Sequence, residues 1–231
     1  MDDNLNVDRA NIVVNDNIER GEAALADADS PYHHGNLREA LLARAEAVLA
    51  ETGADSLSLR ALARDLGVSH AAPGRHFRDR QALLDALAVG GFTRLNEALR
   101  AAVDEPGPVT ARLAGMGRAY IAFAVANAPL LSLMFTAKHA DDSSAELREL
   151  GHQSLHIAAG LVALAQQEGV VRAGEPDRLA QVAFSTVHGL AALAVGSLLE
   201  DTPLSEATDL ALEVLLAGLA APRGDAAHAG A

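Results

Sequence analysis

The residues from Ser58 to Phe77, SLRALARDLGVSHAAPGRHF, decide the fold of this chain. Ser58 is a favourable helix N-cap, and the apolar residues after it share one helical face as far as Leu66. Gly67 can take the left-handed backbone conformation that ends a helix, and Ser69 can cap a second short helix. Two short helices joined by a tight turn form a helix-turn-helix, whose second helix enters the major groove of DNA. The stretch therefore predicts a domain that reads a DNA sequence.

Three segments of the chain resemble a known family. They are YHHGNLREALLARAEAVLAETG (residues 32–53), LSLRALARDLGVS (57–69) and RHFRDRQALLDAL (75–87). Together they are similar to the N-terminal domain of TetR/AcrR-type transcriptional regulators. Residues 186–189, TVHG, also resemble a Trp-His-Gly motif of one C-terminal subclass of that family, with Val187 in place of the Trp. The resemblance implies an operator-binding protein with a small-molecule effector site in its C-terminal domain.

The hydrophobic pattern predicts an all-α chain of about nine helices, because Ala and Leu dominate its 231 residues and there is no Trp. The predicted parts are a flexible acidic tail over 1–30, a helix-turn-helix DNA-binding domain over 31–78, a helical ligand-binding and dimerisation domain over 79–222 and a flexible tail over 223–231. In the larger domain we expect a long helix from Arg80 that Gly90-Gly91 can bend, a short apolar turn at 130–135 and a helix over 177–200.

The acidic charge is spread unevenly along the chain. The formal net charge is −13, made up of −6 in residues 1–30, zero in 31–92 and −7 in 93–231. The predicted DNA-binding domain is thus the least negative part. The acidic remainder should weaken non-specific DNA binding and leave specificity to a few local contacts.

Side chains at the start of a recognition helix face base edges, and flanking side chains hold phosphates. The candidate DNA-binding residues are Arg60, Ser69, His70, Ala71, Ala72, Gly74, Arg75, His76 and Arg80. The two alanines offer only apolar contact, for instance to a thymine methyl group. By the resemblance, Arg80 occupies the place of a phosphate-binding lysine and Gly74 that of a tyrosine. For His76, packing that fixes the next helix is an equally good interpretation.

The resemblance also implies a ligand pocket in the C-terminal domain, with mostly apolar walls and a few polar groups. The candidate ligand-binding residues are Met116, Tyr120, Phe123, Met134, Phe135, Phe184 and His188. For each of them, a place in the ordinary hydrophobic core is at least as good an interpretation.

The helix predicted over 177–200 is apolar on two faces, so it must be covered twice. Phe184 and His188 fall on one face, with Val195 and Leu199. The second face and the final helix predict a four-helix dimer interface between two copies of the chain. The candidate dimer-interface residues are Leu179, Val182, Thr186, Leu190, Leu193, Leu210 and Val214.

Other functions find little support in the sequence. No cysteine is present, which excludes disulfides, thiolate catalysis and Cys-ligated zinc. His152 and His156 are four residues apart, but no carboxylate has the spacing of a third ligand, so we expect no metal and no other cofactor. The uncharged run 182–199 approaches membrane-spanning length, yet a helix buried within a dimer explains it as well, so we expect no membrane partner. No catalytic motif is found, and we expect a cytoplasmic protein without enzyme activity.

The sequence therefore predicts a homodimeric repressor that reads double-stranded operator DNA and is released by a small, largely apolar effector. An activator or a ligand-independent regulator of the same fold is one alternative. A helical-bundle enzyme or carrier without affinity for duplex DNA is another.

Overall fold

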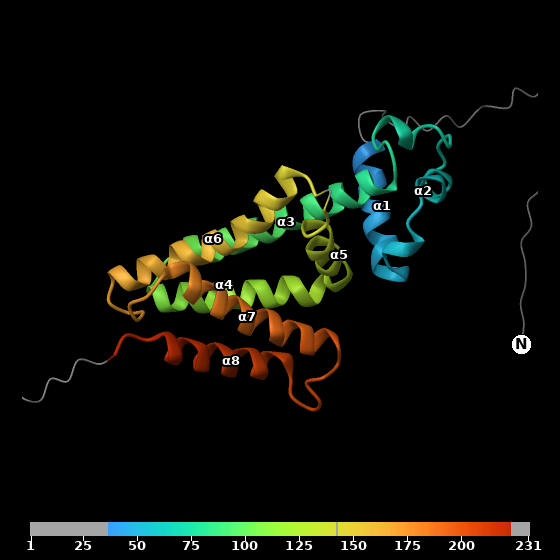
Figure 1. Ribbon diagram of the computed structural model, residues 1–231. Helices are drawn as coiled ribbons and strands as arrows, with labels where there is room; N and C mark the ends of the chain where they lie inside the picture. The colour runs from blue at the N-terminus through green and yellow to red at the C-terminus, as the bar shows by residue number, and fades with distance from the viewer. Residues whose placement is uncertain (1–36, 142, 223–231) are drawn as a thin grey trace, which may run out of the picture. The chain divides into compact units, whose positions relative to one another are not determined.

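The computed structural model describes residues 37–141 and 143–222, which belong to one compact unit (Figure 1). The described residues contain eight α-helices, two 3₁₀ turns and no strand, so the predicted all-α fold is confirmed. The tails predicted over 1–30 and 223–231 lie outside the described residues, as do the first residues of the predicted DNA-binding domain. The helices are α1 (Leu37–Thr52), α2 (Leu59–Asp65), α3 (Arg80–Asp104), α4 (Val109–Ala126), α5 (Ala128–Lys138), α6 (Ala145–Gln167), α7 (Pro176–Val195) and α8 (Leu204–Leu219).

The N-terminal head consists of α1, α2, the 3₁₀ turns Ala54–Ser56 and Pro73–Arg75, and the start of α3. Ser58 occupies the N-cap position of α2, although its side chain makes no capping hydrogen bond, and Gly67 has φ 66 after that helix, as the sequence predicts. The predicted cap of α3 is also present, since the carboxylate of Asp79 accepts a hydrogen bond from Ala82 N at 2.8 Å. These local signals fix where the head's helices begin and end.

Helix α3 joins the head to the helical body and continues through Gly90-Gly91 as one α-helix. Gly91 is instead buried at the crossing of α3 and α5. A Cβ added there would lie 2.5 Å from Met134 Sδ. The absence of a side chain thus lets the two helices approach closely.

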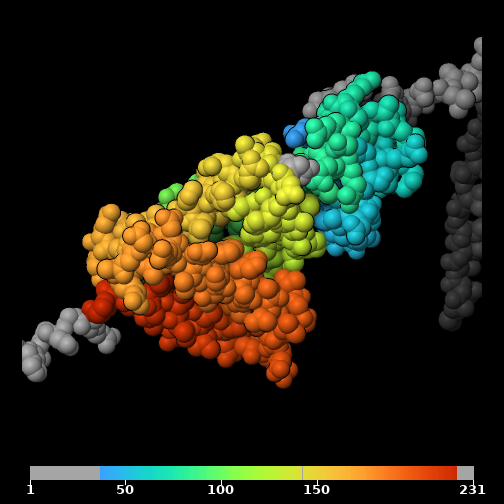
Figure 2. Space-filling model, viewed as in Figure 1, coloured from blue at the N-terminus to red at the C-terminus, as the bar shows by residue number. Residues whose placement is uncertain are grey.

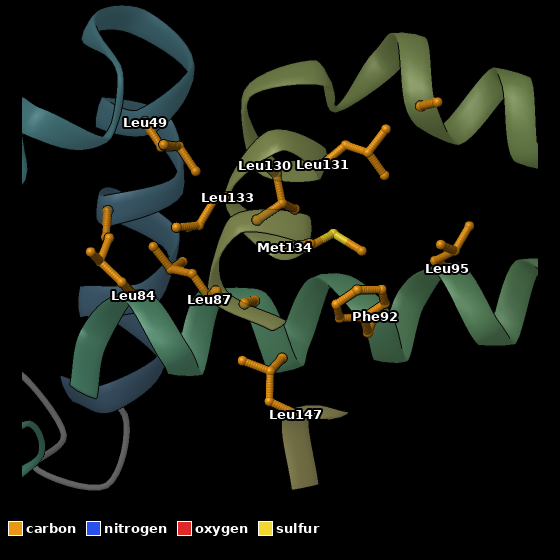
Figure 3. Close-up of a cluster of buried hydrophobic side chains, with 14 of the residues drawn as sticks. Leu49, Leu84, Leu87, Phe92, Leu95, Leu130, Leu131, Leu133, Met134 and Leu147 are labelled. Atoms are coloured by element: carbon orange, nitrogen blue, oxygen red, sulfur yellow. The ribbon is translucent and has the colours of Figure 1, made fainter. Parts of the chain in front are cut away.

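Helix α5 replaces the short apolar turn predicted at 130–135. Pro129 lies in the first turn of this helix, where its missing N–H leaves no intrahelical bond unmade. It therefore starts a new helix at an angle of 100° to α4. Figure 3 shows Leu130 and Leu133 of α5 in the same apolar cluster as Leu49 of α1 and Leu87 of α3.

In the body, α4 packs against α3 and α7, while α6 packs against α3 and α7, and α8 covers α4 and α7. One polar group is buried between α3 and α6. Asn96 is fully buried, donates to Leu150 O at 3.0 Å and accepts from Ser154 Oγ at 2.6 Å. Helix α7 ends at Val195, before the predicted end at residue 200, and Gly196 is its C-cap.

Candidate nucleic-acid interface and ligand clefts

The predicted recognition helix is not an α-helix. Residues 70–72 form a turn, and only Pro73–Arg75 are helical, as a single 3₁₀ turn. Two of its hydrogen bonds span three residues, from Ala72 N to Ser69 O at 2.9 Å and from His76 N to Pro73 O at 2.9 Å. Pro73 has no N–H to donate, and glycine is the poorest helix former after proline. The Pro73-Gly74 pair is therefore the physical reason why the expected helix, and its cap by Ser69, is wrong.

The recognition segment, residues 69–76, nevertheless presents nearly all of the predicted DNA-binding residues to solvent. Pro73 is buried and Ala72 is half-buried against the core, and these two residues anchor the segment. The exposed residues are Ser69, His70, Ala71, Gly74, Arg75 and His76. Phe77 follows as a core residue that is 2% exposed, with the Arg38 guanidinium 5.5 Å from its ring centroid.

Two exposed arginines of the head have no ion-pair partner among the described residues. Arg60 and Arg75 are both exposed, and neither forms an ion pair with any residue that the structure describes. By contrast Arg44 pairs with Asp65 at 3.0 Å. An exposed guanidinium without a carboxylate partner is the group that a phosphate or a guanine edge can bind.

Arg80 has a structural role that the sequence did not reveal. Its side chain donates to Leu57 O at 3.1 Å and to Ala54 O at 2.6 Å, and Asp55 is 3.9 Å away. The guanidinium thus ties the start of α3 to the turn before α2. Any contact of Arg80 with a phosphate remains a prediction, and its removal would also loosen the head.

The predicted ligand-binding residues do not line one pocket. Met116, Tyr120 and Phe184 line a narrow, almost wholly apolar cavity of about 60 Å³ between α4, α6, α7 and α8. Phe135 and His188 line a separate cleft of about 330 Å³ between α5 and α7. The other two predicted residues line neither space, because Met134 is fully buried in the core and Phe123 packs half-buried against it.

Tyr120 and His188 form the wall between the two spaces. Tyr120 Oη and His188 Nδ1 are 2.7 Å apart, and the imidazole stacks on Phe184 with ring centroids 5.2 Å apart. Burial raises the pKa of the Tyr120 hydroxyl and lowers the pKa of His188 below its ordinary 6.5. Both side chains are therefore neutral at neutral pH.

Two protein-family models match the sequence of this chain. The model for bacterial regulatory proteins of the tetR family matches residues 41–87, and the model for the tetracyclin repressor-like C-terminal domain matches residues 113–219. The chain belongs to the TetR family. It is a DNA-binding regulator of transcription, with a helix-turn-helix head and a C-terminal helical domain.

Solved structures share the fold of this chain. A protein of unknown function from Rhodococcus sp. RHA1 is 49% identical, with a TM-score of 0.79 over 83% of this chain and 100% of the other. The TetR family regulator PfmR from Thermus thermophilus shares the fold at 18% identity, with a TM-score of 0.62 over 77% and 97% of the two chains. A tetR-family regulatory protein from Rhodococcus RHA1 shares it at 16% identity, with a TM-score of 0.63 over 79% and 96%. No curated protein matches the sequence.

The predicted dimer face of this TetR-family chain is largely exposed. The exposed fractions are 56% for Val182, 45% for Leu193, 60% for Leu210 and 63% for Val214. Val182, Leu210 and Val214 line a groove of about 740 Å³ between α7 and α8. The half-buried Leu179 and Thr186 line the same groove. Leu193 lies outside the groove, and Leu190 packs partly against the core.

Exposed apolar residues that sequence reasoning missed extend this face. Val195 is 49% exposed at the end of α7, and Leu198 is 65% exposed in the loop that follows. Figure 2 shows α8 in red and the end of α7 in orange along one edge of the surface. The helical periodicity predicts Val195 on the same face as Phe184 and His188. It also predicts a helix that includes Leu198, whereas α7 ends at Val195.

The other features of the TetR-family chain are not gathered into a site. His152 and His156 are both exposed on α6, and no group of three His, Cys, Asp or Glu residues that could hold a metal occurs within the described ranges. Of the described helices only α7 is by itself long and apolar enough to cross a membrane, with a mean hydropathy of 1.3. One such helix is weak evidence for a membrane span, and α7 packs against α4, α6 and α8.

Proposed function

We propose that this protein is a homodimeric transcriptional repressor that a small, largely apolar molecule releases from its operator. Residues 31–78 read the DNA, and residues 79–222 hold the two copies together and bind the ligand. The observation that carries the proposal is the exposed recognition segment with two guanidinium groups that pair with no described carboxylate, Arg75 within the segment and Arg60 on α2. The protein acts in the cytoplasm, without a metal, another cofactor or a membrane.

Dimerisation is supported by the exposed apolar side chains of α7 and α8. Four apolar residues there, Val182, Leu193, Leu210 and Val214, are each at least 45% exposed. A patch of this kind indicates a covered surface, and a second copy with twofold symmetry covers it with the same face. Two heads held at a fixed distance then suit a palindromic operator.

Release requires that the ligand bind the DNA-free arrangement of the two heads more tightly than the DNA-bound arrangement. A ligand with equal affinity for both would shift nothing, however tightly it bound. The contact between α1 and α5, whose residues Leu49 and Leu130 belong to one apolar cluster, is the route by which the body can move the head. Repression rather than activation then depends on where the operator lies relative to the promoter.

The test is binding to duplex DNA from the region upstream of the protein's own gene, measured by fluorescence anisotropy at a stated salt concentration. We expect Arg60→Ala and Arg75→Ala each to weaken binding about tenfold, since each removes a contact to phosphate or to a base edge. Arg100→Ala is the matched control, because Arg100 is equally exposed but lies on the body part of α3. Equal affinities for all four proteins would contradict the proposed surface.

A further inference from the structure

The cleft between α5 and α7 has the size of a ligand site, whereas the narrow cavity lined by Tyr120 and Phe184 does not. Its volume is about 330 Å³ against about 60 Å³ for the cavity. Small-molecule sites in proteins measure roughly 300–1,000 Å³. Figure 2 shows α5 in yellow-green and α7 in orange at the molecular surface. The cleft is lined by Ala124, Ala128, Leu131, Ser132, Phe135, Thr136, His188, Ala191, Ala192 and Val195.

The hydrogen bond to Tyr120 decides which nitrogen of His188 carries the proton. Tyr120 is 4% exposed, and its hydroxyl has no described partner other than His188 Nδ1. If Nδ1–H donated, the tyrosine proton would be buried without an acceptor, which costs about 1–3 kcal/mol. Tyr120 therefore donates, Nδ1 accepts, and the neutral ring carries its proton on Nε2.

The ring of His188 is held in place, and its Nε2 is not fully buried. The ring is stacked on Phe184 and meets the edge of Phe135 with centroids 5.4 Å apart. Nε2 has no hydrogen-bond partner among the described residues, and it is not one of their fully buried unpartnered atoms. Because His188 lines the cleft, this donor is reached from the cleft.

The remaining polar groups of the cleft are uncharged. Ser132 and Thr136 lie one helical turn apart on α5, and neither side chain hydrogen-bonds to another described residue. No charged residue of the described parts of the chain lines the cleft. An ionic ligand would therefore lose its hydration without a counter-charge, whereas a neutral ligand would not.

We propose that the α5–α7 cleft is the effector site and that it takes a small uncharged molecule with an apolar body and a carbonyl-type oxygen, which accepts a hydrogen bond from His188 Nε2–H. The role of this molecule as an effector rests on the proposed repressor function. Its binding to the cleft does not.

The test uses cyclohexanone and acetophenone as probes, with their hydrocarbon isosteres methylenecyclohexane and α-methylstyrene as controls. Binding to the full-length protein is measured by saturation-transfer NMR. We expect each ketone to bind about fivefold more tightly than its isostere, which is the strength of one neutral hydrogen bond. His188→Phe should remove that difference, and Met116→Leu should keep it, because Met116 lines the narrow cavity and not the cleft.

A second variant leaves the Tyr120–His188 pair intact. Ala192 is exposed at the cleft, so Ala192→Trp should fill it and block ketone and hydrocarbon alike. Equal affinity of ketone and isostere, no binding of either ketone, or ketone binding unaffected by both His188→Phe and Ala192→Trp would overturn the site. Ketone binding that follows the expected pattern but leaves operator affinity unchanged would support the site and contradict ligand release.

Discussion

Gly90 and Gly91 are neighbours in α3 with opposite surroundings. A Cβ on Gly91 would lie 2.5 Å from Met134 Sδ and 2.9 Å from its Cγ, whereas a Cβ on Gly90 meets nothing within 4 Å. We expect Gly91→Ala to lower the free energy of unfolding by about 1–3 kcal/mol, because Met134 is fully buried and must shift. Gly90→Ala should raise it by about 0.4–1 kcal/mol. Urea unfolding measures the free energy of unfolding of both variants. Equal values would contradict the close approach of α3 and α5 at Gly91.

His188 should make stability depend on pH. Burial lowers its pKa from the ordinary 6.5, so the unfolded chain binds a proton there more readily than the folded protein. The stability that neutral His188 contributes is therefore complete above about pH 6.5 and is lost as the pH falls below it. We expect His188→Phe to shrink the drop in Tm between about pH 7.5 and about pH 5.5. His152→Gln, a change at an exposed histidine of α6, should leave the drop unchanged, and a drop unaltered by His188→Phe would contradict the argument.

At the scale of elements, substitutions at two glycines of the helix-turn-helix can distinguish the effect of backbone strain from the effect of steric clashes with an added Cβ. Neither Gly67 nor Gly74 has an atom within 4 Å of an added Cβ, but Gly67 has φ 66 and Gly74 has no positive φ. We expect Gly74→Ala to stabilise the head by up to about 1 kcal/mol through helix propensity. Gly67→Ala should destabilise it by about 1–2 kcal/mol, because the left-handed conformation strains alanine.

Thermal unfolding of the two variants provides the measurement. If Gly74→Ala also lowered Tm, the 3₁₀ turn of the recognition segment would need glycine at that position, and the explanation through Pro73-Gly74 would be incomplete. Operator affinity of Gly74→Ala then tells whether a more helical recognition segment reads DNA better, since the substitution adds no polar group.

For the whole molecule, the decisive property is the number of copies. Val214 is 63% exposed on α8 and borders the groove between α7 and α8. Val214→Asp should leave the monomer folded and abolish the dimer, because a carboxylate would be buried without a partner at a twofold interface. Light scattering after size exclusion should give twice 23.9 kDa for the natural chain and 23.9 kDa for the variant.

The matched control carries the same charge elsewhere. Ala122 is exposed on α4, away from the residues that line the α7–α8 groove, so Ala122→Asp should remain dimeric. A natural chain that elutes as a monomer would refute the proposed dimer outright. A dimeric Val214→Asp would move the interface to another face. Leu190 is a poorer position for this test, because it packs partly against the core.

The sequence by itself determined the features that depend on neighbouring residues. Asp79 caps α3 and Gly67 ends the turn after α2, because capping and backbone conformation involve only a few successive residues. The exposed positions of the recognition segment follow from the same short-range geometry. The absence of an α-helix in the recognition segment also has a local cause, because Pro73-Gly74 disfavours one. The prediction of a helix there followed the family resemblance and not this dipeptide.

Only the tertiary structure decided which helices meet. Tyr120 and His188 are 68 residues apart, and no periodicity says that their side chains bond or that they divide the predicted pocket into a cavity and a cleft. The sequence does not reveal that α5 packs against Gly91. It also does not reveal that the side chain of Arg80 donates hydrogen bonds to the carbonyl oxygens of Ala54 and Leu57. A helical pattern states which face is buried, but the partner of that face is fixed by the packing of the whole chain.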